Sequence, residues 1–285
     1  MTPEQAVALA CDALGTDPAQ AEVLRAADAV TVRVDAGRVA RVIPGDADSI
    51  VATQRVLVAI AQLPEHILQP LGDAFVLGDT LVVPYPLVVP GAPADADLGI
   101  AGACLAALHT TGRHLLADDR LDLPVFDPLV IATRWLDRSI AVFTESERAD
   151  LLGAIGEHWL DVAGEPTVIH GDAHRANWWP QRTDWWMLID PEFLSLGPAV
   201  YDLAPLEVTE RRLGLGPSRF PSFQAGYESL AGRIDPTALA AAIRVRELLS
   251  VAWLASRVGE DSQIAVRARH RLSDALNGRD GSWLA

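Results

Sequence analysis

Lysine is absent from the chain, and all 23 basic residues are arginine. A catalytic lysine is therefore excluded. Only two cysteines are present, Cys11 and Cys104, and both lie in alanine-rich helical patterns without metal-type spacing. We expect both to be small buried hydrophobic residues and assign them no disulfide and no metal site.

Long hydrophobic runs are also missing. No stretch approaches the roughly 20 apolar residues of a membrane span, and the chain start lacks the basic cap and apolar run of a signal peptide. We therefore expect no membrane partner and a cytoplasmic location. Acidic residues outnumber basic ones, which gives a net charge of −15. This balance argues against a nucleic-acid partner, because phosphate backbones recruit basic faces.

The 285 residues are half hydrophobic, which is enough for one large domain or two lobes. In the first part, Thr2 and Gln5 form a possible capping box before a helix. Alternating apolar residues on both sides of short turns predict two hairpins, with a helix between them. The expected elements are a helix at 3–14, strands at 29–34 and 39–43, a helix from Asp46 or Ser49 to about 62, and strands at 75–77 and 81–83.

Four prolines within residues 84–93 change the composition abruptly, and we expect this segment to support neither helix nor central strand. We place a lobe boundary here, between residues 1–86 and 87–285. Helical patterns dominate the second lobe. The expected helices are 95–110, 127–139, 144–162, 199–213, 217–231, 235–258 and 262–276, with clear strands only at 167–169 and 185–189.

The segment HGDAHRANWWPQRTDWWMLIDPE, residues 170–192, contains the groups that phosphoryl transfer needs. Four residues separate Asp172 from Asn177, which is the D-x-x-x-x-N interval of the kinase catalytic loop. Asp172 is thus predicted to orient the attacking hydroxyl and accept its proton, and Asn177 to bind Mg²⁺, which prefers oxygen ligands. A buried-looking strand then leads to Asp190, where a second metal-binding carboxylate is required.

This segment resembles the aminoglycoside phosphotransferase and choline kinase superfamily, whose signature is HGDxHxxN followed by IDxE or IDxD. The later GPAVYDLA at 197–204 resembles the GDPxxDLA of that family, and LAALH at 105–109 resembles its L-x-x-LH element. The IDPEF segment is additionally similar to methylthioribose kinase. The motifs cover about residues 105–206, and elsewhere only the order of elements agrees.

The resemblance implies a two-lobed, protein-kinase-like α+β fold with a small antiparallel sheet and a larger, mostly helical lobe. The lobe at 1–86 would grip the nucleotide, and the lobe at 87–285 would be catalytic and bind the acceptor. It implies that Asp172 is the catalytic base and that His170 orients its loop by hydrogen bonding. The metal ligands would be Asn177 and Asp190, with Glu192 as an accessory acidic group. His174, Asp202 and His109 would be structural supports.

Kinase-like enzymes usually cover the phosphates with a glycine-rich loop and bind them with a strand lysine that pairs with a helix glutamate. Residues 16–36 contain no glycine, so a loop at 25–28 would approach the nucleotide with Cβ atoms in the way. The lysine position holds Arg41, whose fork binds two phosphate oxygens. The glutamate position falls near Thr53 or Gln54, and neither forms the ion pair.

Two other readings stay open at this point. One is a kinase-like binding module that has lost catalysis, because all three departures lie in the lobe that grips the nucleotide. The other is a metal-dependent hydrolase, because His170, Asp172 and His174 form HxDxH and such residues bind zinc. The hydrolase reading leaves Asn177 and Asp190 without a role.

We therefore expect ATP or GTP with Mg²⁺ to bind between the lobes, beside Arg41, Val83 and Tyr85. The acceptor would be a hydroxyl of an antibiotic such as an aminoglycoside, a sugar or an amino alcohol. The sequence leaves the acceptor, the choice of nucleotide and the oligomeric state open. Two sets of side chains could bind a cation or could have ordinary structural roles, and we expect ordinary structural roles for both sets. Trp178, Trp179, Trp185 and Trp186 are expected to pack in the core, and Glu207, Glu210 and Glu228 to face solvent.

Overall fold

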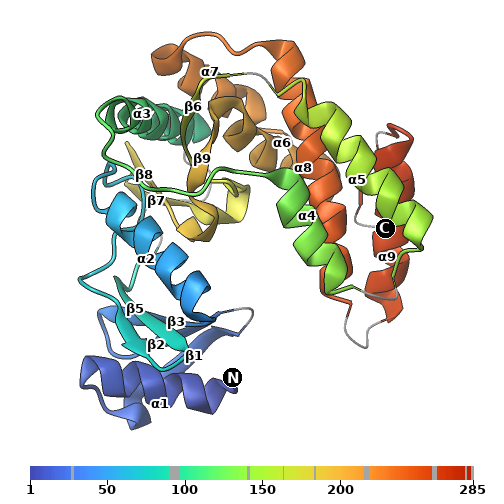
Figure 1. The fold of residues 1–285 in the computed structure, drawn as a ribbon. Helices are drawn as coiled ribbons and strands as arrows, with labels where there is room; N and C mark the ends of the chain where they lie inside the picture. Colours follow the sequence, from blue (N-terminus) through green and yellow to red (C-terminus); the bar gives the residue numbers. More distant parts are fainter. Residues whose placement is uncertain are drawn as a thin grey trace.

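The computed structural model describes residues 1–26, 29–89, 91, 97–139, 142–162, 164–182, 184–214, 218–258, 262–279 and 281–283. A five-stranded antiparallel sheet with two flanking helices forms a small lobe, and a larger, mostly helical part follows it (Figure 1). The predicted two-lobed α+β architecture is confirmed.

Both small-lobe helices start at the predicted caps. Helix α1 (Pro3–Leu14) begins with the capping box of Thr2 and Gln5, and Gly15 ends it with a left-handed φ of 62°. Asp46 caps helix α2 (Ala47–Ile60) by accepting a hydrogen bond from the Ser49 amide. These local signals suffice because a cap satisfies amides that have no partner inside the helix.

The strands of the small lobe are β1 (Glu22–Ala26), β2 (Val30–Arg33), β3 (Arg38–Pro44), β4 (Phe75–Leu77) and β5 (Thr80–Pro86). They lie in the order β1-β2-β3-β5-β4. Side chains alternate between the two faces of the sheet. One set, which includes Ala40 and Val42, packs against α1, and Val39, Val83 and Tyr85 belong to a separate cluster that includes Ile50 of α2.

Two expectations for the small lobe were wrong. Strand β1 was not predicted, because its largely exposed residues show no clear alternation. The proline-rich segment also supplies the last residues of β5, a strand that lies between β3 and β4. Pro84 and Pro86 fit there because β4 pairs only with Thr80–Val82, so one side of β5 is free of a strand beyond that point. Of the loop 25–28, residues 27–28 lie outside the described residues.

The larger lobe contains the expected helices, although the helix expected to end at 110 continues to Ala117 and the one expected from 199 begins at Ala204. They are α3 (Leu98–Ala117), α4 (Pro128–Asp137), α5 (Glu145–Trp159), α6 (Ala204–Leu213), α7 (Phe220–Ala231), α8 (Pro236–Ser256) and α9 (Ser262–Leu276). The predicted starts at 95 and 217 lie outside the described residues. Among these residues no helix has both the length and the apolar character that crossing a bilayer demands.

Two short antiparallel sheets of two strands each position the segment 170–192. Strand β6 (Pro166–Ile169) pairs with β9 (Ser195–Pro198), and β7 (Trp178–Arg182) pairs with β8 (Trp185–Leu188). Strands β7 and β9 were missed, because proline or glycine interrupts the apolar pattern of each. Leu68 donates its amide to the Leu188 carbonyl at 3.0 Å, so the segment after α2 is tied to the end of β8.

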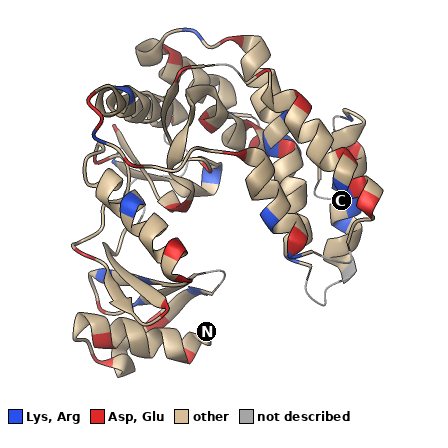
Figure 2. Cartoon of the chain, in the orientation of Figure 1, with Lys and Arg blue, Asp and Glu red and all other residues tan. Residues whose placement is uncertain are grey.

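Charged residues of both signs are interspersed over the two lobes in the view of Figure 2. The termini lie apart, with the N-terminus at the small lobe and the C-terminus beside α9 (Figure 1).

Candidate active site

A buried carboxylate, Asp202, clamps the loop that follows β6. Its side chain is 0% exposed and accepts hydrogen bonds from the amides of His170 at 2.6 Å and Gly171 at 2.7 Å. It also accepts from Nε2 of His109 at 3.0 Å, and Nδ1 of His109 lies 2.9 Å from the Tyr227 hydroxyl. The loop is therefore held from α3, α7 and the turn before α6 at once.

Gly171 and its surroundings fix the direction of the loop. Its φ is +79°, and a Cβ there would lie 2.7 Å from the Phe193 carbonyl oxygen. Only glycine combines that backbone conformation with such a close approach. The next residue, Asp172, is thereby directed out of the core, with its side chain 20% exposed.

His170 is a scaffold residue in this geometry. It is fully buried, its Nε2 lies 3.0 Å from the Ile189 carbonyl, and its Nδ1 accepts the Asp172 amide at 3.3 Å. A carbonyl only accepts, so we assign the proton to Nε2. Burial lowers the pKa of His170, with Asp202 acting in the opposite direction. Because both ring nitrogens are engaged by the backbone, His170 is unavailable as a metal ligand in a hydrolytic HxDxH site.

Asp172 lies between two basic side chains. Nη2 of Arg246, from α8, is 2.5 Å from Oδ1 of Asp172, and Nε2 of His174 is 3.6 Å from its Oδ2. Asn177 bonds back to the same loop, because its Nδ2 donates to the Asp172 carbonyl at 2.9 Å. The amide oxygen of Asn177 is thus left for another partner.

Asp190 follows β8 in a strained backbone conformation. Its φ of 65° and ψ of 55° place a non-glycine residue in the left-handed region, which is uncommon and typical of functional sites. Its carboxylate pairs with Arg41 of β3 and, at 3.2 Å, with Arg25 of β1. Arg41 also pairs with Glu192. Arg41 therefore joins the sheet of the small lobe to the acidic turn after β8.

These acidic pairs answer the question of the missing helix glutamate. Thr53, at the expected position, donates its hydroxyl to the Ser49 carbonyl within α2. The basic side chain of β3 instead has its acidic partners in the other lobe. No local sequence rule connects residues so far apart in the chain.

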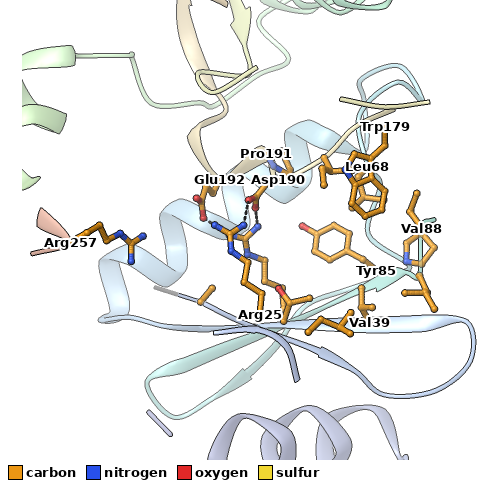
Figure 3. A pocket seen from close by; sticks show the side chains of 17 residues that line it. Arg25, Val39, Leu68, Tyr85, Val88, Trp179, Asp190, Pro191, Glu192 and Arg257 are labelled. Atoms are coloured by element: carbon orange, nitrogen blue, oxygen red, sulfur yellow. Dashed lines mark hydrogen bonds and ion pairs between the residues drawn. The ribbon is translucent and has the colours of Figure 1, made fainter. Parts of the chain in front are cut away.

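A cavity of about 290 Å³ lies between the small lobe and this turn. In Figure 3, Leu68, Tyr85, Val88 and Trp179 gather at one end, and Arg257 approaches from the opposite end, with Asp190 and Glu192 between them. Arg25 and Arg41 complete the charged part of the lining. The cavity thus has an apolar end and a charged end.

The cavity includes two of the three predicted nucleotide contacts. Arg41 and Tyr85 line it, whereas Val83 is fully buried in the cluster with Ile50 and does not. Burial raises the pKa of Tyr85 to about 12, so its hydroxyl stays protonated. Sequence reasoning missed Arg246 and Arg257 as residues of the site, and it named Arg25 only as part of the loop at 25–28.

The oxygen atoms near the turn suit Mg²⁺. Asn177 offers an amide oxygen, and Asp190 and Glu192 offer carboxylates, which are the hard ligands that Mg²⁺ prefers. Within the part of the chain that the structure describes, no group of three or more His, Cys, Asp and Glu residues is placed to hold a metal. The residues thus fit an ion held partly by protein and partly by a nucleotide better than an all-protein cage.

The expectation that four tryptophans pack in the core was wrong for two of them, because Trp179 lines the cavity and Trp185 is only half-buried. Trp178 and Trp186 are 1% and 0% exposed and belong to the main core. The expectation that Glu210 faces solvent was wrong: it is buried and accepts the Arg219 amide at 2.5 Å and the Phe220 amide at 3.0 Å, at the start of α7. Glu228 accepts from Gln224.

Comparisons with known proteins identify the family and the fold of the chain. The sequence model of a family described as "Phosphotransferase enzyme family" matches residues 20–242. No curated protein matches the chain.

Solved structures with the same fold include two kinases of the choline type. A choline/ethanolamine kinase family protein from Mesorhizobium loti is 15% identical, with a TM-score of 0.63 over 99% of this chain and 100% of that one. Choline kinase LicA from Streptococcus pneumoniae is 13% identical, with a TM-score of 0.67 over 96% of this chain and 98% of that one.

A third similar structure carries ligands in its description. It is aminoglycoside phosphotransferase APH(3'')-Id from Streptomyces rimosus, in complex with ADP and streptomycin. It is 20% identical, with a TM-score of 0.65 over 87% of this chain and 99% of that one.

Proposed function

Because the chain belongs to the phosphotransferase enzyme family, we propose that it moves the γ-phosphoryl group of ATP or GTP to a hydroxyl of a small polar molecule. The observation that supports this most directly is the clamp of Asp202 on the catalytic loop. It directs Asp172 out of the core on one side, while β8 delivers Asp190 beside the cavity on the other. A base and a phosphate-binding region are therefore adjacent.

Asp172 is the base of the proposed reaction. As the acceptor oxygen forms its bond to the γ-phosphorus, the hydroxyl proton passes to the Asp172 carboxylate. The bond between the γ-phosphorus and the β–γ bridging oxygen breaks, and its electron pair leaves with the nucleoside diphosphate. Such transfer depends mainly on positioning and on charge stabilisation, which the clamped loop and the arginines supply.

Asn177 and Asp190 would hold Mg²⁺, with Glu192 as an accessory acidic group. When bound by these residues, the ion would supply positive charge that neutralises the transferring phosphates. Arg41 and Arg25 stand where a lysine and a glycine-rich loop act in other kinase-like enzymes. Their guanidinium groups fork onto phosphate oxygens, and we infer that they exchange Asp190 for phosphate when a nucleotide binds.

The apolar end of the cavity, with Tyr85, Val88 and Trp179, accommodates the base of the nucleotide. The acceptor then lies beyond Asp172, on the side of α8. The similar structures name choline and streptomycin in their descriptions, so amino alcohols, antibiotics and sugars form the first panel of acceptors. If the acceptor is an antibiotic, phosphorylation would inactivate it. We propose a cytoplasmic location for the enzyme, because the cytoplasm supplies the nucleotide.

A catalytically inactive binding module is the second candidate, because the pairs of Arg41 and Arg25 with Asp190 occupy a proposed metal ligand. Turnover separates the two. An active enzyme releases nucleoside diphosphate in an acceptor-dependent and Mg²⁺-dependent manner, whereas a binding module shows nucleotide binding alone.

The first prediction concerns Asp172→Asn, which keeps the shape of the side chain and removes the base. We expect kcat to fall by about 10²- to 10⁴-fold while the melting temperature changes little, as measured by a coupled nucleoside diphosphate assay and circular dichroism. Asp184→Asn is the matched control, since Asp184 is 75% exposed in the turn of the β7–β8 hairpin. Wild-type turnover in Asp172→Asn would refute the proposed base.

A further inference from the structure

Arg246 of α8 differs from two other arginines that contact this helix. Arg244 of α8 and the buried Arg212 of α6 both pair with Glu247, and Arg212 also donates to the Arg279 and Gly281 carbonyls. Those contacts join α8 to α6 and the C-terminal segment. Arg246 instead extends to the catalytic loop, where Asp172 is its ion-pair partner among the described residues. Arg246 therefore contacts the candidate site, whereas Arg244 and Arg212 join elements of the larger lobe.

The surroundings of Arg246 make this cation significant. Its side chain is only 17% exposed, and it lies beside the fully buried Tyr201. Burial raises the pKa of Tyr201 to about 12, and Arg246 opposes that rise, so the Tyr201 hydroxyl remains neutral and gives Arg246 no compensating charge. A guanidinium so far removed from water needs an anionic partner, because an unpaired buried charge is strongly unfavourable.

The contact with Asp172 conflicts with the proposed role of that carboxylate. A base must offer an oxygen to the acceptor hydroxyl, yet Arg246 holds one oxygen at 2.5 Å and His174 lies 3.6 Å from the other. An acceptor that carries its own anionic group resolves the conflict. Its anion becomes the partner of Arg246, and its hydroxyl takes the place of Arg246 on Asp172.

A cationic acceptor is disfavoured beside Arg246. A positive charge beside Arg246 is repelled at short range in a site with little water. The glutamates of α6 have other partners: Glu210 accepts the amides at the start of α7, and Glu207 lies 3.9 Å from Arg211. Arg257, at the end of α8, adds further positive charge beside the nucleotide cavity.

We propose that Arg246 is a specificity-determining residue that binds a carboxylate of the acceptor, so that the acceptor is a hydroxy acid. This inference rests on the proposed phosphotransferase function and narrows its acceptor class. A carboxylate matches the planar fork of a guanidinium in a bidentate manner, whereas an ammonium or a neutral hydroxyl does not.

The test uses acceptor pairs that differ in the carboxylate, namely gluconate with glucose and glycerate with glycerol, and choline as a cationic acceptor. Coupled nucleotide turnover is measured with the wild type, Arg246→Gln and Arg246→Lys. Arg233→Gln is the matched control, because Arg233 is exposed just before α8. We expect the wild type to prefer the acid of a pair by about 10- to 100-fold in kcat/KM, the worth of one charge-assisted contact.

Arg246→Gln should abolish that preference mainly through KM for the acid, and Arg246→Lys should restore part of it. If Arg246 acted only on Asp172, the glutamine variant would lower kcat equally for acids and neutral alcohols and shift the acid limb of every pH–rate profile alike. That result overturns the proposal. A wild type that prefers choline or the neutral alcohols overturns it too, while the proposed function stands as long as Asp172→Asn is inactive.

A binding measurement makes the test independent of turnover. With ADP and Mg²⁺ present, gluconate or glycerate should raise the melting temperature of the wild type more than the neutral partner does. The glutamine variant should lose this difference and retain the shift caused by ADP, which also shows that it is folded. Equal shifts by acid and alcohol in the wild type contradict the carboxylate site even if no acceptor of the panel is phosphorylated.

Discussion

At the scale of single residues, Asp202 is the side chain that holds the loop after β6 in place. One fully buried carboxylate receives the His170 and Gly171 amides and His109. A carboxylate only accepts hydrogen bonds, and these three donors have no water to turn to. The position of Asp172, and with it the catalytic geometry, depends on this one side chain.

We therefore predict that Asp202→Asn lowers the free energy of unfolding by about 3 kcal/mol, because the amide NH₂ replaces an acceptor and leaves a buried donor unsatisfied. Urea unfolding measures the change. Asp235→Asn is the control, since Asp235 caps α8 through the Thr237 amide and asparagine caps equally well. If Asp202→Asn lowered the free energy of unfolding no more than the control does, the loop would have adjusted to the asparagine amide and the prediction would be wrong.

At the scale of elements, α3 and α7 approach so closely that glycine is required between them. A Cβ on Gly102 would lie 1.9 Å from the Phe223 carbonyl oxygen, and one on Gly226 would lie 1.8 Å from the Gly99 carbonyl oxygen. The two helices carry His109 and Tyr227, the outer part of the Asp202 network. Their spacing thus reaches the catalytic loop.

Gly102→Ala should separate these helices and lower the free energy of unfolding by about 1–3 kcal/mol, the usual effect of overpacking. Gly153→Ala is the matched control, because Gly153 lies in α5 and a Cβ on it would have no neighbouring atom within 4 Å. Alanine there should stabilise the protein by about 0.5–1 kcal/mol through helix propensity. Thermal unfolding of both variants measures the change in stability. If alanine changed the stability in the same direction at both positions, the close packing of α3 and α7 would be contradicted.

At the scale of the whole molecule, the two lobes are joined across the cavity by ion pairs. Arg41 and Arg25 of the sheet pair with Asp190, and Arg257 of the helical lobe lines the same cavity. A nucleoside triphosphate placed there contacts cations from both lobes. Its binding should therefore stabilise the whole fold and not one lobe alone.

We predict that ATP or GTP with Mg²⁺, at 100 times its Kd, adds about 2.7 kcal/mol to the free energy of unfolding by mass action. The melting transition should stay single and move upward, as followed by calorimetry. Removal of Mg²⁺ with a chelator should reduce the shift. A transition that splits into two, with only one half responding, would show that the nucleotide binds within one lobe.

The sequence by itself determined much of the local structure and predicted which segment carries the catalytic groups. The capping box at Thr2 and the cap at Asp46 marked helix starts because their partners lie within three residues. The interval from Asp172 to Asn177 and the strand before Asp190 identified the catalytic segment for the same reason. Strands β1, β7 and β9 were missed because a short strand forms only by pairing with a partner strand, and the local sequence does not specify that partner.

The tertiary structure alone decided which distant side chains meet. That Arg41 pairs with Asp190 and Glu192, and that Arg246 reaches Asp172, follows from how the sheet, the β8 turn and α8 pack together. An ion pair between residues far apart in the chain has no fixed spacing and no period, so no pattern in the sequence encodes it. The sequence predicted the position of the proposed base, and only the tertiary structure showed that Arg246 faces it.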